Sequence, residues 1–182
     1  RACARRIRPR ARRYRECVTR IIAGRAGSIT LEVPDAGTRP TSDRVRESLF
    51  GALESADALR GSAVLDLYAG SGALGLEAVS RGAASVDLVE KAPRAASVAQ
   101  RNADRVLKSV GRDAAIRVHR AAADLFLRGA GGPFDLVFLD PPRYAKSAFG
   151  VVDLVHDYAA LFKPALLATE EGGTLICCNN DA

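Results

Sequence analysis

The residues Val64-Leu-Asp-Leu-Tyr-Ala-Gly-Ser-Gly-Ala-Leu-Gly75 are the most informative part of this sequence for predicting its fold. A short apolar run, 64–68, leads directly into a G-x-G-x-x-G loop, and a helical pattern that closes at Gly82 follows it. This order is typical of the first strand, loop and helix of a nucleotide-binding α/β sheet, because glycines permit a tight turn and a close approach of the backbone to a ligand. The stretch therefore predicts a cofactor site at the end of its strand.

The chain from residue 61 onward continues the alternation of strands and helices. Further strands are predicted at 85–90, 115–120, 134–139 and 174–178. Helices are predicted at 93–111 and 151–169, the second with a break before Pro164. Five strands separated by helices indicate an α/β fold with a doubly wound, mostly parallel, Rossmann-like sheet.

A smaller segment precedes the sheet. Two short runs, 19–23 and 28–33, flank a glycine-containing turn and predict a hairpin. After a proline-bounded linker, Thr41, Ser42 and Asp43 offer caps for a helix over 44–54. That helix is expected to bury four apolar side chains and to leave two arginines, Arg44 and Arg46, pointing elsewhere. The four apolar residues are Val45, Leu49, Phe50 and Leu53.

The charge of the chain is concentrated at its start. The 182 residues carry a net charge of +6, whereas residues 1–20, with nine arginines and one acid, carry +8. Residues 21–182 therefore carry the difference, −2. Such an arm is consistent with a solvated tail, with an Arg-rich transit peptide, or with a segment that contacts nucleic-acid phosphates. We expect a flexible basic arm at 1–18, a hairpin-and-helix extension at 19–60 and a catalytic domain at 61–182.

Composition excludes several classes of protein. An apolar share of 48% with 26% charged residues excludes wholesale disorder and collagen-like repeats. No apolar run approaches the ~20 residues that a membrane-spanning helix needs. The four cysteines form no C-x-x-C pair, so neither a zinc site nor another metal site is predicted. The cysteine pattern indicates a reduced protein of the cytoplasm.

Two acids indicate which cofactor the glycine loop binds. Glu90 lies at the end of the second predicted strand, where a ribose-binding acid belongs. Asp66 precedes the first glycine by four residues and is expected to place negative charge at the mouth of the site. That charge would repel the pyrophosphate of NAD and attract the ammonium and sulfonium of S-adenosylmethionine. S-adenosylmethionine is therefore the favoured cofactor, with a turn-capping role for Asp66 as the alternative.

The sequence Asp140-Pro-Pro142 follows directly on the predicted buried strand 134–139. Residues just past such a strand line the ligand crevice of a parallel sheet. The acid and the carbonyls of Pro141 and Pro142 can accept hydrogens from an exocyclic amine, and Tyr144 can stack on a base swung out of its helix. The alternative is an ordinary turn at the end of a strand. Asp124, after the third strand, is a candidate for the adenine amine or for a helix N-cap.

Four motifs resemble the bacterial 16S rRNA guanine-N2 methyltransferase family, a class I S-adenosylmethionine-dependent family. They are Thr19-Arg-Ile-Ile-Ala-Gly24, Gly37-Thr-Arg-Pro-Thr41, Asp43-Arg-Val-Arg-Glu-Ser-Leu-Phe50 and Leu65-Asp-Leu-Tyr-Ala-Gly-Ser-Gly-Ala-Leu-Gly-Leu-Glu-Ala78. The resemblance is close over residues 19–90 and looser to about 142. It implies an enzyme that methylates ribosomal RNA, and the substrate is either the free RNA or a partly assembled subunit. We expect the chain to be a monomer.

The resemblance also implies roles for particular residues. The residues expected to take part in catalysis are Asp140, Pro141, Pro142 and Tyr144. The residues expected to bind the cofactor are Asp66, Tyr68, Ala69, Gly70, Gly72, Glu90 and Asp124. Arginines of the motifs, Arg20, Arg39, Arg44 and Arg46, are predicted to contact RNA. Methyltransferases of this class also add an antiparallel strand pair after the fifth strand, so we expect that this chain, which ends at Ala182, is truncated there.

Two departures keep the target atom open. The family has an aromatic residue directly after Asp-Pro-Pro, whereas Arg143 intervenes here before Tyr144. The stretches 138–146 and 173–180 are more similar to 23S rRNA methyltransferases that modify guanine N7 or cytosine C5. C5 chemistry needs a thiolate nucleophile, and the cysteine of that family aligns with Asn180, which disfavours it. An NAD-dependent oxidoreductase leaves Asp140-Pro-Pro142 unused, and a non-catalytic RNA-binding module leaves the crevice acids unexplained.

Overall fold

The computed structural model describes residues 19–34, 42–129, 132–141, 144–147 and 150–178, with the backbone alone over 144–160. The main strands are β3 (Ala63–Leu67), β4 (Ser85–Val89), β5 (Ala115–His119), β6 (Phe134–Leu139) and β9 (Thr169–Cys177). The helices are α1 (Asp43–Ser55), α2 (Ala73–Ser80), α3 (Pro93–Val110), α4 (Ala123–Gly129) and α5 (Leu154–Leu167), with a 3₁₀ turn at Gly111–Asp113. Two antiparallel pairs are β1 (Thr19–Arg20) with β2 (Thr30–Leu31) and β7 (Tyr144–Ser147) with β8 (Gly150–Asp153).

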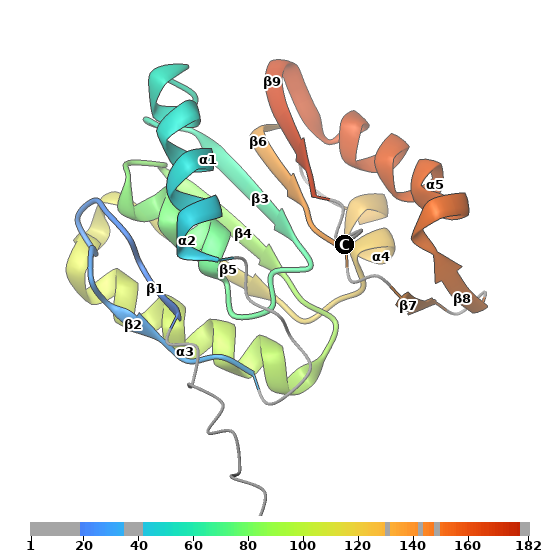
Figure 1. Ribbon diagram of the computed structural model, residues 1–182, viewed down its shortest axis with the longest axis horizontal. Helices are drawn as coiled ribbons and strands as arrows, with labels where there is room; N and C mark the ends of the chain where they lie inside the picture. Colours follow the sequence, from blue (N-terminus) through green and yellow to red (C-terminus); the bar gives the residue numbers. More distant parts are fainter. Residues whose placement is uncertain (1–18, 35–41, 130–131, 142–143, 148–149, 179–182) are drawn as a thin grey trace, which may run out of the picture.

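The five main strands form one parallel sheet in the order β5-β4-β3-β6-β9 (Figure 1). The chain moves outward from β3 through β4 to β5 and then returns to place β6 on the other side of β3. The order therefore reverses between β3 and β6. In open α/β sheets the ligand crevice lies at this point, beyond the carboxyl ends of the strands.

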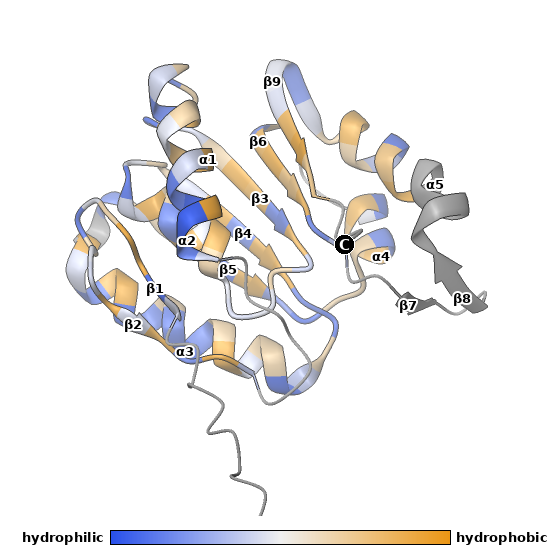
Figure 2. Cartoon of the chain, viewed as in Figure 1, coloured by the Kyte–Doolittle hydropathy of each residue, from blue (hydrophilic) through white to orange (hydrophobic). Residues whose placement is uncertain are grey.

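Apolar side chains cover both faces of the sheet. Alternate strand residues such as Val64, Val86 and Leu136 pack with the hairpin and with α1, α2 and α3 in one cluster. The intervening residues, such as Leu65 and Val137, pack with α4 and α5 in a second cluster. Figure 2 shows β3, β4 and β6 mostly orange, whereas α3 alternates between orange and blue. This is the pattern of strands buried on both faces and of a helix with one solvated side.

The hairpin and α1 share the core of the sheet. Ile21 and Leu31 are buried in the same cluster as the strands, and the ring of Phe50 lies 5.9 Å from that of Phe138 on β6. The hairpin and the sheet therefore form one packed body. Residues 1–18, the predicted basic arm, lie outside the described residues.

The buried face of α1 differs from the prediction. Phe50 and Leu53 are buried as expected, but Arg46 is buried as well and Val45 is 55% exposed. Positions 46, 50 and 53 follow helical spacing, so the inner face is rotated by one residue. The apolar pattern of α1 did not predict the burial of position 46, because that position holds an arginine. Its charged partners come together only in the folded chain.

The C-terminal third also corrects three predictions. Residues 151–153 belong to β8 and not to the helix, consistent with the β preference of Val151 and Val152. Pro164 lies inside α5 without ending it, and Ala168 N–H donates to its carbonyl at 3.1 Å. The predicted turn at Gly172 is an irregularity within β9, where the register with β6 shifts between Phe134 and Leu136.

We expect Gly24→Ala to destabilise the fold by at least about 2 kcal/mol. Gly24 has a φ of +81°, and an added Cβ would lie 2.0 Å from the carbonyl oxygen of Ser80 on α2. Gly61 is the matched control, because its φ is +75° but a Cβ there would meet nothing within 4 Å. Urea unfolding of both variants separates backbone strain from the clash. Equal losses for the two would contradict the close approach.

No helix in the described part of the chain is both long and apolar enough to cross a membrane.

Candidate functional site

The strand register aligns three residues at the carboxyl edge of the sheet. Leu67 pairs with Val89 on β4 and with Leu139 on β6. The residues that follow these three positions, Tyr68, Glu90 and Asp140, therefore leave the sheet at the same level. Two acids predicted from different motifs are brought together by this register at the reversal of strand order.

Asp66 lies beneath this edge and is 1% exposed. Its carboxylate accepts the N–H of Gly75 at 2.9 Å, in the first turn of α2. Its pKa is raised to about 7, mainly by burial and also by the negative charges of Asp140 and Glu90, against the lowering effect of the Gly75 hydrogen bond. Asp66 therefore fixes the glycine loop from below. This corrects the expectation that its carboxylate lies at the mouth of the site.

The register places two acids, Glu90 and Asp140, on either side of β3 at the carboxyl edge of the sheet, above the buried Asp66. Two acids at this edge favour a cation and disfavour an anion. S-adenosylmethionine carries an ammonium and a sulfonium, whereas NAD carries a pyrophosphate. The arrangement fits the first cofactor and does not fit the second.

Glu90 and the glycine loop hold each other in place. One carboxylate oxygen of Glu90 accepts the N–H of Gly70 at 3.0 Å and the other accepts that of Ala92 at 2.7 Å. Gly70 and Gly72 have φ values of +57° and +81°, which favour glycine. A Cβ at Gly70 would meet only the Tyr68 carbonyl oxygen, at 4.0 Å, so open space lies before the loop. The loop therefore fits a cofactor placed against its backbone.

Two further predicted cofactor residues flank the loop. Tyr68 is half-buried, has a φ of +66°, and burial together with the nearby charge of Asp124 raises its pKa to about 12. Ala69 is buried and its N–H donates to the Val89 carbonyl at 3.0 Å. Asp124 is exposed in the first turn of α4, so it is not the residue that caps that helix. The structure thus places all seven predicted cofactor residues at or beside one edge of the sheet.

The predicted catalytic residues are described in part. Asp140 and the buried Pro141 directly follow β6. Pro142 lies outside the described residues, and the backbone of Tyr144 begins β7. Cys178 N–H donates to the Leu139 carbonyl at 2.9 Å, which places Cys178 beside Asp140. The pKa of the Cys178 thiol is raised to about 11, mainly by burial and also by the nearby charge of Asp140.

The arginines predicted to contact RNA have different environments. Arg44 is exposed on α1, and Arg20 is largely exposed beside Asp43, at 3.4 Å. Arg39 lies outside the described residues. The side chain of Arg46 has no exposed surface and pairs with Asp43 and Glu77. The prediction that Arg46 contacts RNA is therefore wrong, because a buried guanidinium cannot contact a phosphate.

The sequence prediction missed two buried polar residues beside the loop. Asn102 on α3 is fully buried and donates to the carbonyls of Ser71 and Glu32, joining the loop to the hairpin strand. Glu77 on α2 is also fully buried and holds the hairpin. A signal for both residues was present in the sequence. Each is a single charged or amide residue among the apolar residues of one helical face.

We expect Glu90→Ala to weaken cofactor binding about ten- to hundredfold. The change removes a hydrogen-bonding carboxylate, a loss of about 1.5–3 kcal/mol, and it releases the N–H of Gly70. Isothermal titration with S-adenosylmethionine measures the effect, and Glu90→Gln should give an intermediate loss because one oxygen remains. Unchanged affinity in both variants would contradict the assignment of Glu90.

Comparisons with known proteins show which family this chain resembles. A family model described as Conserved hypothetical protein 95 matches residues 19–177. The ribosomal RNA small subunit methyltransferase D of Escherichia coli strain K12 is 40% identical over 154 residues, which cover 83% of this chain and 73% of that protein.

Solved structures share the fold. A hypothetical protein from Thermus thermophilus superposes with a TM-score of 0.71 at 34% identity, over 88% of this chain and 85% of that chain. An S-adenosylmethionine-dependent methyltransferase from Agrobacterium tumefaciens superposes with a TM-score of 0.60 at 23% identity, over 84% of this chain and 46% of that chain. The predicted α/β, Rossmann-like methyltransferase fold is confirmed.

Proposed function

Since this chain belongs to the Conserved hypothetical protein 95 family, we propose that it methylates a guanine of small-subunit ribosomal RNA at the exocyclic N2. The chain is an S-adenosylmethionine-dependent rRNA methyltransferase. The single observation that carries the proposal is the alignment of Glu90 and Asp140 beside the glycine loop at the reversal of strand order.

The proposed division of roles follows from the position of each residue. The cofactor supplies a methyl group on a positively charged sulfur, which is a strong electrophile. Glu90 and the glycine loop hold the cofactor, and Asp66 holds the loop. Asp140 and the Pro141 carbonyl accept hydrogens from the guanine amine and aim its nitrogen lone pair. Alignment of the reacting atoms then supplies most of the rate enhancement.

Tyr144 is proposed to stack on the extruded base, and stacking of this kind contributes about 1–3 kcal/mol. The base is read in a single-stranded or extruded state because its amine is inaccessible within a helix. Arg20 and Arg44 are proposed to contact phosphates, with Arg39 of the same motifs. Contacts to phosphates add affinity without sequence specificity.

The alternatives differ in the group they modify. A cytosine C5 reaction needs a thiolate nucleophile, and the raised pKa keeps the Cys178 thiol protonated at neutral pH. An oxidoreductase that uses NAD would place a pyrophosphate near two acids, Glu90 and Asp140. Guanine N7 needs no amine hydrogens to be accepted, so it makes no use of the acid that follows β6.

The test is transfer of labelled methyl groups to purified 16S rRNA, to 23S rRNA and to partly assembled small subunits, followed by mass spectrometry of the digested RNA. N2-methylguanine in 16S rRNA is expected, and comparison of free RNA with particles identifies the substrate form. N7-methylguanine in 23S rRNA, or 5-methylcytosine in either RNA, would overturn the proposal. We propose a monomer acting in the cytoplasm, where subunits assemble, and light scattering tests the monomer.

A further inference from the structure

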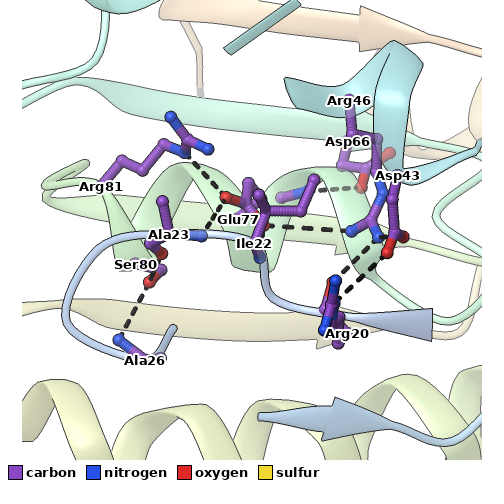
Figure 3. A network of polar contacts seen from close by, with 11 residues as sticks. Arg20, Ile22, Ala23, Ala26, Asp43, Arg46, Asp66, Glu77, Ser80 and Arg81 are labelled. Carbon is purple, nitrogen blue, oxygen red and sulfur yellow. Dashed lines mark hydrogen bonds and ion pairs between the residues drawn. The ribbon is translucent and has the colours of Figure 1, made fainter. Parts of the chain in front are cut away.

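A buried polar network joins the N-terminal hairpin to α2 (Figure 3). Its centre is Glu77, whose side chain has no exposed surface. One carboxylate oxygen accepts the N–H of Ile22 at 2.7 Å, and the other accepts the N–H of Ala23 at 3.0 Å. The Nε of Arg81 donates to the same carboxylate at 2.7 Å. A single carboxylate thus fixes two consecutive amides of the hairpin.

Arg46 of α1 closes the network from the other side. Its Nη2 donates to the Arg20 carbonyl at 2.9 Å and to Asp43 at 2.6 Å. Its Nη1 lies 3.9 Å from the Glu77 carboxylate, and Nη1 and Nε have no hydrogen-bond partner among the described residues. The attraction between Arg46 and Glu77 is therefore Coulombic, whereas short hydrogen bonds to the hairpin amides set the carboxylate position.

Ser80 supplies a second anchor one helical turn after Glu77. Its hydroxyl accepts the N–H of Ala26 at 2.9 Å and donates to the Ala23 carbonyl. The Ser80 carbonyl accepts the N–H of Arg25 at 2.8 Å. The hairpin loop is thus fastened to α2 at both of its ends by directional bonds.

Buried ion pairs are a weak source of stability, because the cost of removing charges from water offsets their attraction. Well-packed apolar residues often serve stability as well or better. Hydrogen bonds to a fixed carboxylate, in contrast, give the hairpin a defined orientation relative to α2. The network therefore specifies where the hairpin lies on α2, in addition to any contribution to stability.

The position of α2 connects this orientation to the active site. The helix begins directly after Gly72 of the glycine loop, and Asp66 fixes its first turn at Gly75. Glu77 lies five positions after Gly72, which corresponds to about 7.5 Å along a helix. The hairpin and α1 carry Arg20 and Arg44, which are proposed to contact RNA. A short rigid segment thus separates the cofactor loop from the extension.

We propose that Glu77 is a positioning residue for the RNA substrate. It holds the hairpin-and-helix extension at a fixed place relative to the cofactor loop, so that RNA bound by the extension presents its base to the crevice. This inference rests on the proposed function, because it assumes an RNA substrate. It predicts that loss of the Glu77 anchor impairs productive binding of RNA more than binding of the cofactor.

The experiment compares Glu77→Gln with the wild type and with Glu171→Gln, an exposed acid on β9 outside the network. Steady-state methylation of 16S rRNA, or of the subunit particle if that is the substrate, gives KM and kcat. Isothermal titration gives cofactor affinity without RNA. For Glu77→Gln we expect at least a tenfold rise in KM for RNA, less than a threefold change in kcat, and less than a twofold change in cofactor affinity. Glu171→Gln should match the wild type.

Amide hydrogen exchange tests the anchor itself. The amides of Ile22 and Ala23 should lose protection in Glu77→Gln, while those within β3 and β4 keep it. If Glu77→Gln does not fold, Ser80→Ala decides, because it removes two hairpin bonds and leaves every charge in place. Ser80→Ala should raise KM for RNA in the same direction by a smaller factor.

An unchanged KM in the variants that fold, or equal losses in kcat, KM and cofactor affinity, would overturn the inference. Failure of the proposed function has a different signature, because the wild type itself would then form no N2-methylguanine in 16S rRNA. Hydrogen exchange needs no substrate, so it still reports whether Glu77 holds the hairpin.

Discussion

Replacement of Asp140 by Ala is expected to lower the rate of methyl transfer by a hundredfold or more, on the order of 3 kcal/mol. The carboxylate is proposed to accept a hydrogen of the guanine amine and to orient its lone pair, and this contact is needed most in the transition state. Rates with saturating RNA and cofactor measure the loss. Binding of S-adenosylmethionine should change by less than threefold, since Glu90 and the loop hold the cofactor.

Asp140→Asn is the matched variant for this prediction. The amide keeps one acceptor oxygen and removes the negative charge, so a smaller loss than in Asp140→Ala is expected. Both variants remove the repulsion that helps to raise the pKa of Asp66, so neither should destabilise the loop. A rate for Asp140→Ala within threefold of the wild type would contradict the assigned role.

Asp66 is expected to make the stability of the protein depend on pH between about 4 and 7. Burial raises its pKa from 3.8 to about 7 in the folded chain. The folded state therefore binds the proton more tightly than the unfolded state. Stability is highest below the unfolded pKa and falls as the pH rises through the folded pKa. The rise in the pKa of Asp66 from 3.8 to about 7 corresponds to a loss of about 4 kcal/mol in the free energy of unfolding at high pH.

Urea unfolding of Asp66→Asn and the wild type at pH 4 and pH 8 measures this effect. The amide keeps an oxygen for the N–H of Gly75 and removes the titration. The variant should gain stability relative to the wild type as the pH rises, by as much as about 4 kcal/mol. Saturating S-adenosylmethionine should reduce the pH dependence of the wild type, because a bound cation favours the ionised acids. A stability difference that stays constant with pH would contradict the raised pKa.

The predicted site residues lie together in the structure where the sequence signal is local. The glycine loop, Glu90 and Asp140 each follow an apolar run of strand length, and a parallel sheet gathers such residues at one edge. The role of Asp66 was misjudged because a sequence does not show which way a strand residue faces at the edge. The register shows it beneath the loop, bound to Gly75.

The N-terminal extension shows where sequence reasoning fails. Arg46 looks like an exposed arginine, because arginine is rarely fully buried. Its burial depends on Asp43, one helical turn earlier, and on Glu77, which lies 31 positions later in the chain. Gly24 likewise looks like an ordinary turn glycine, but its close partner is the Ser80 carbonyl.

The main strands, the glycine loop and the acids that follow the strands were predictable from the chain alone, because hydrophobic periodicity and glycine placement act between near neighbours. Three features became visible in the folded protein: the hairpin belongs to the core of the sheet, Arg46 is buried, and Glu77 holds the hairpin. Those features depend on contacts between residues more than 30 positions apart. A buried charge is stable only beside partners that folding brings to it, and the local pattern carries no record of them.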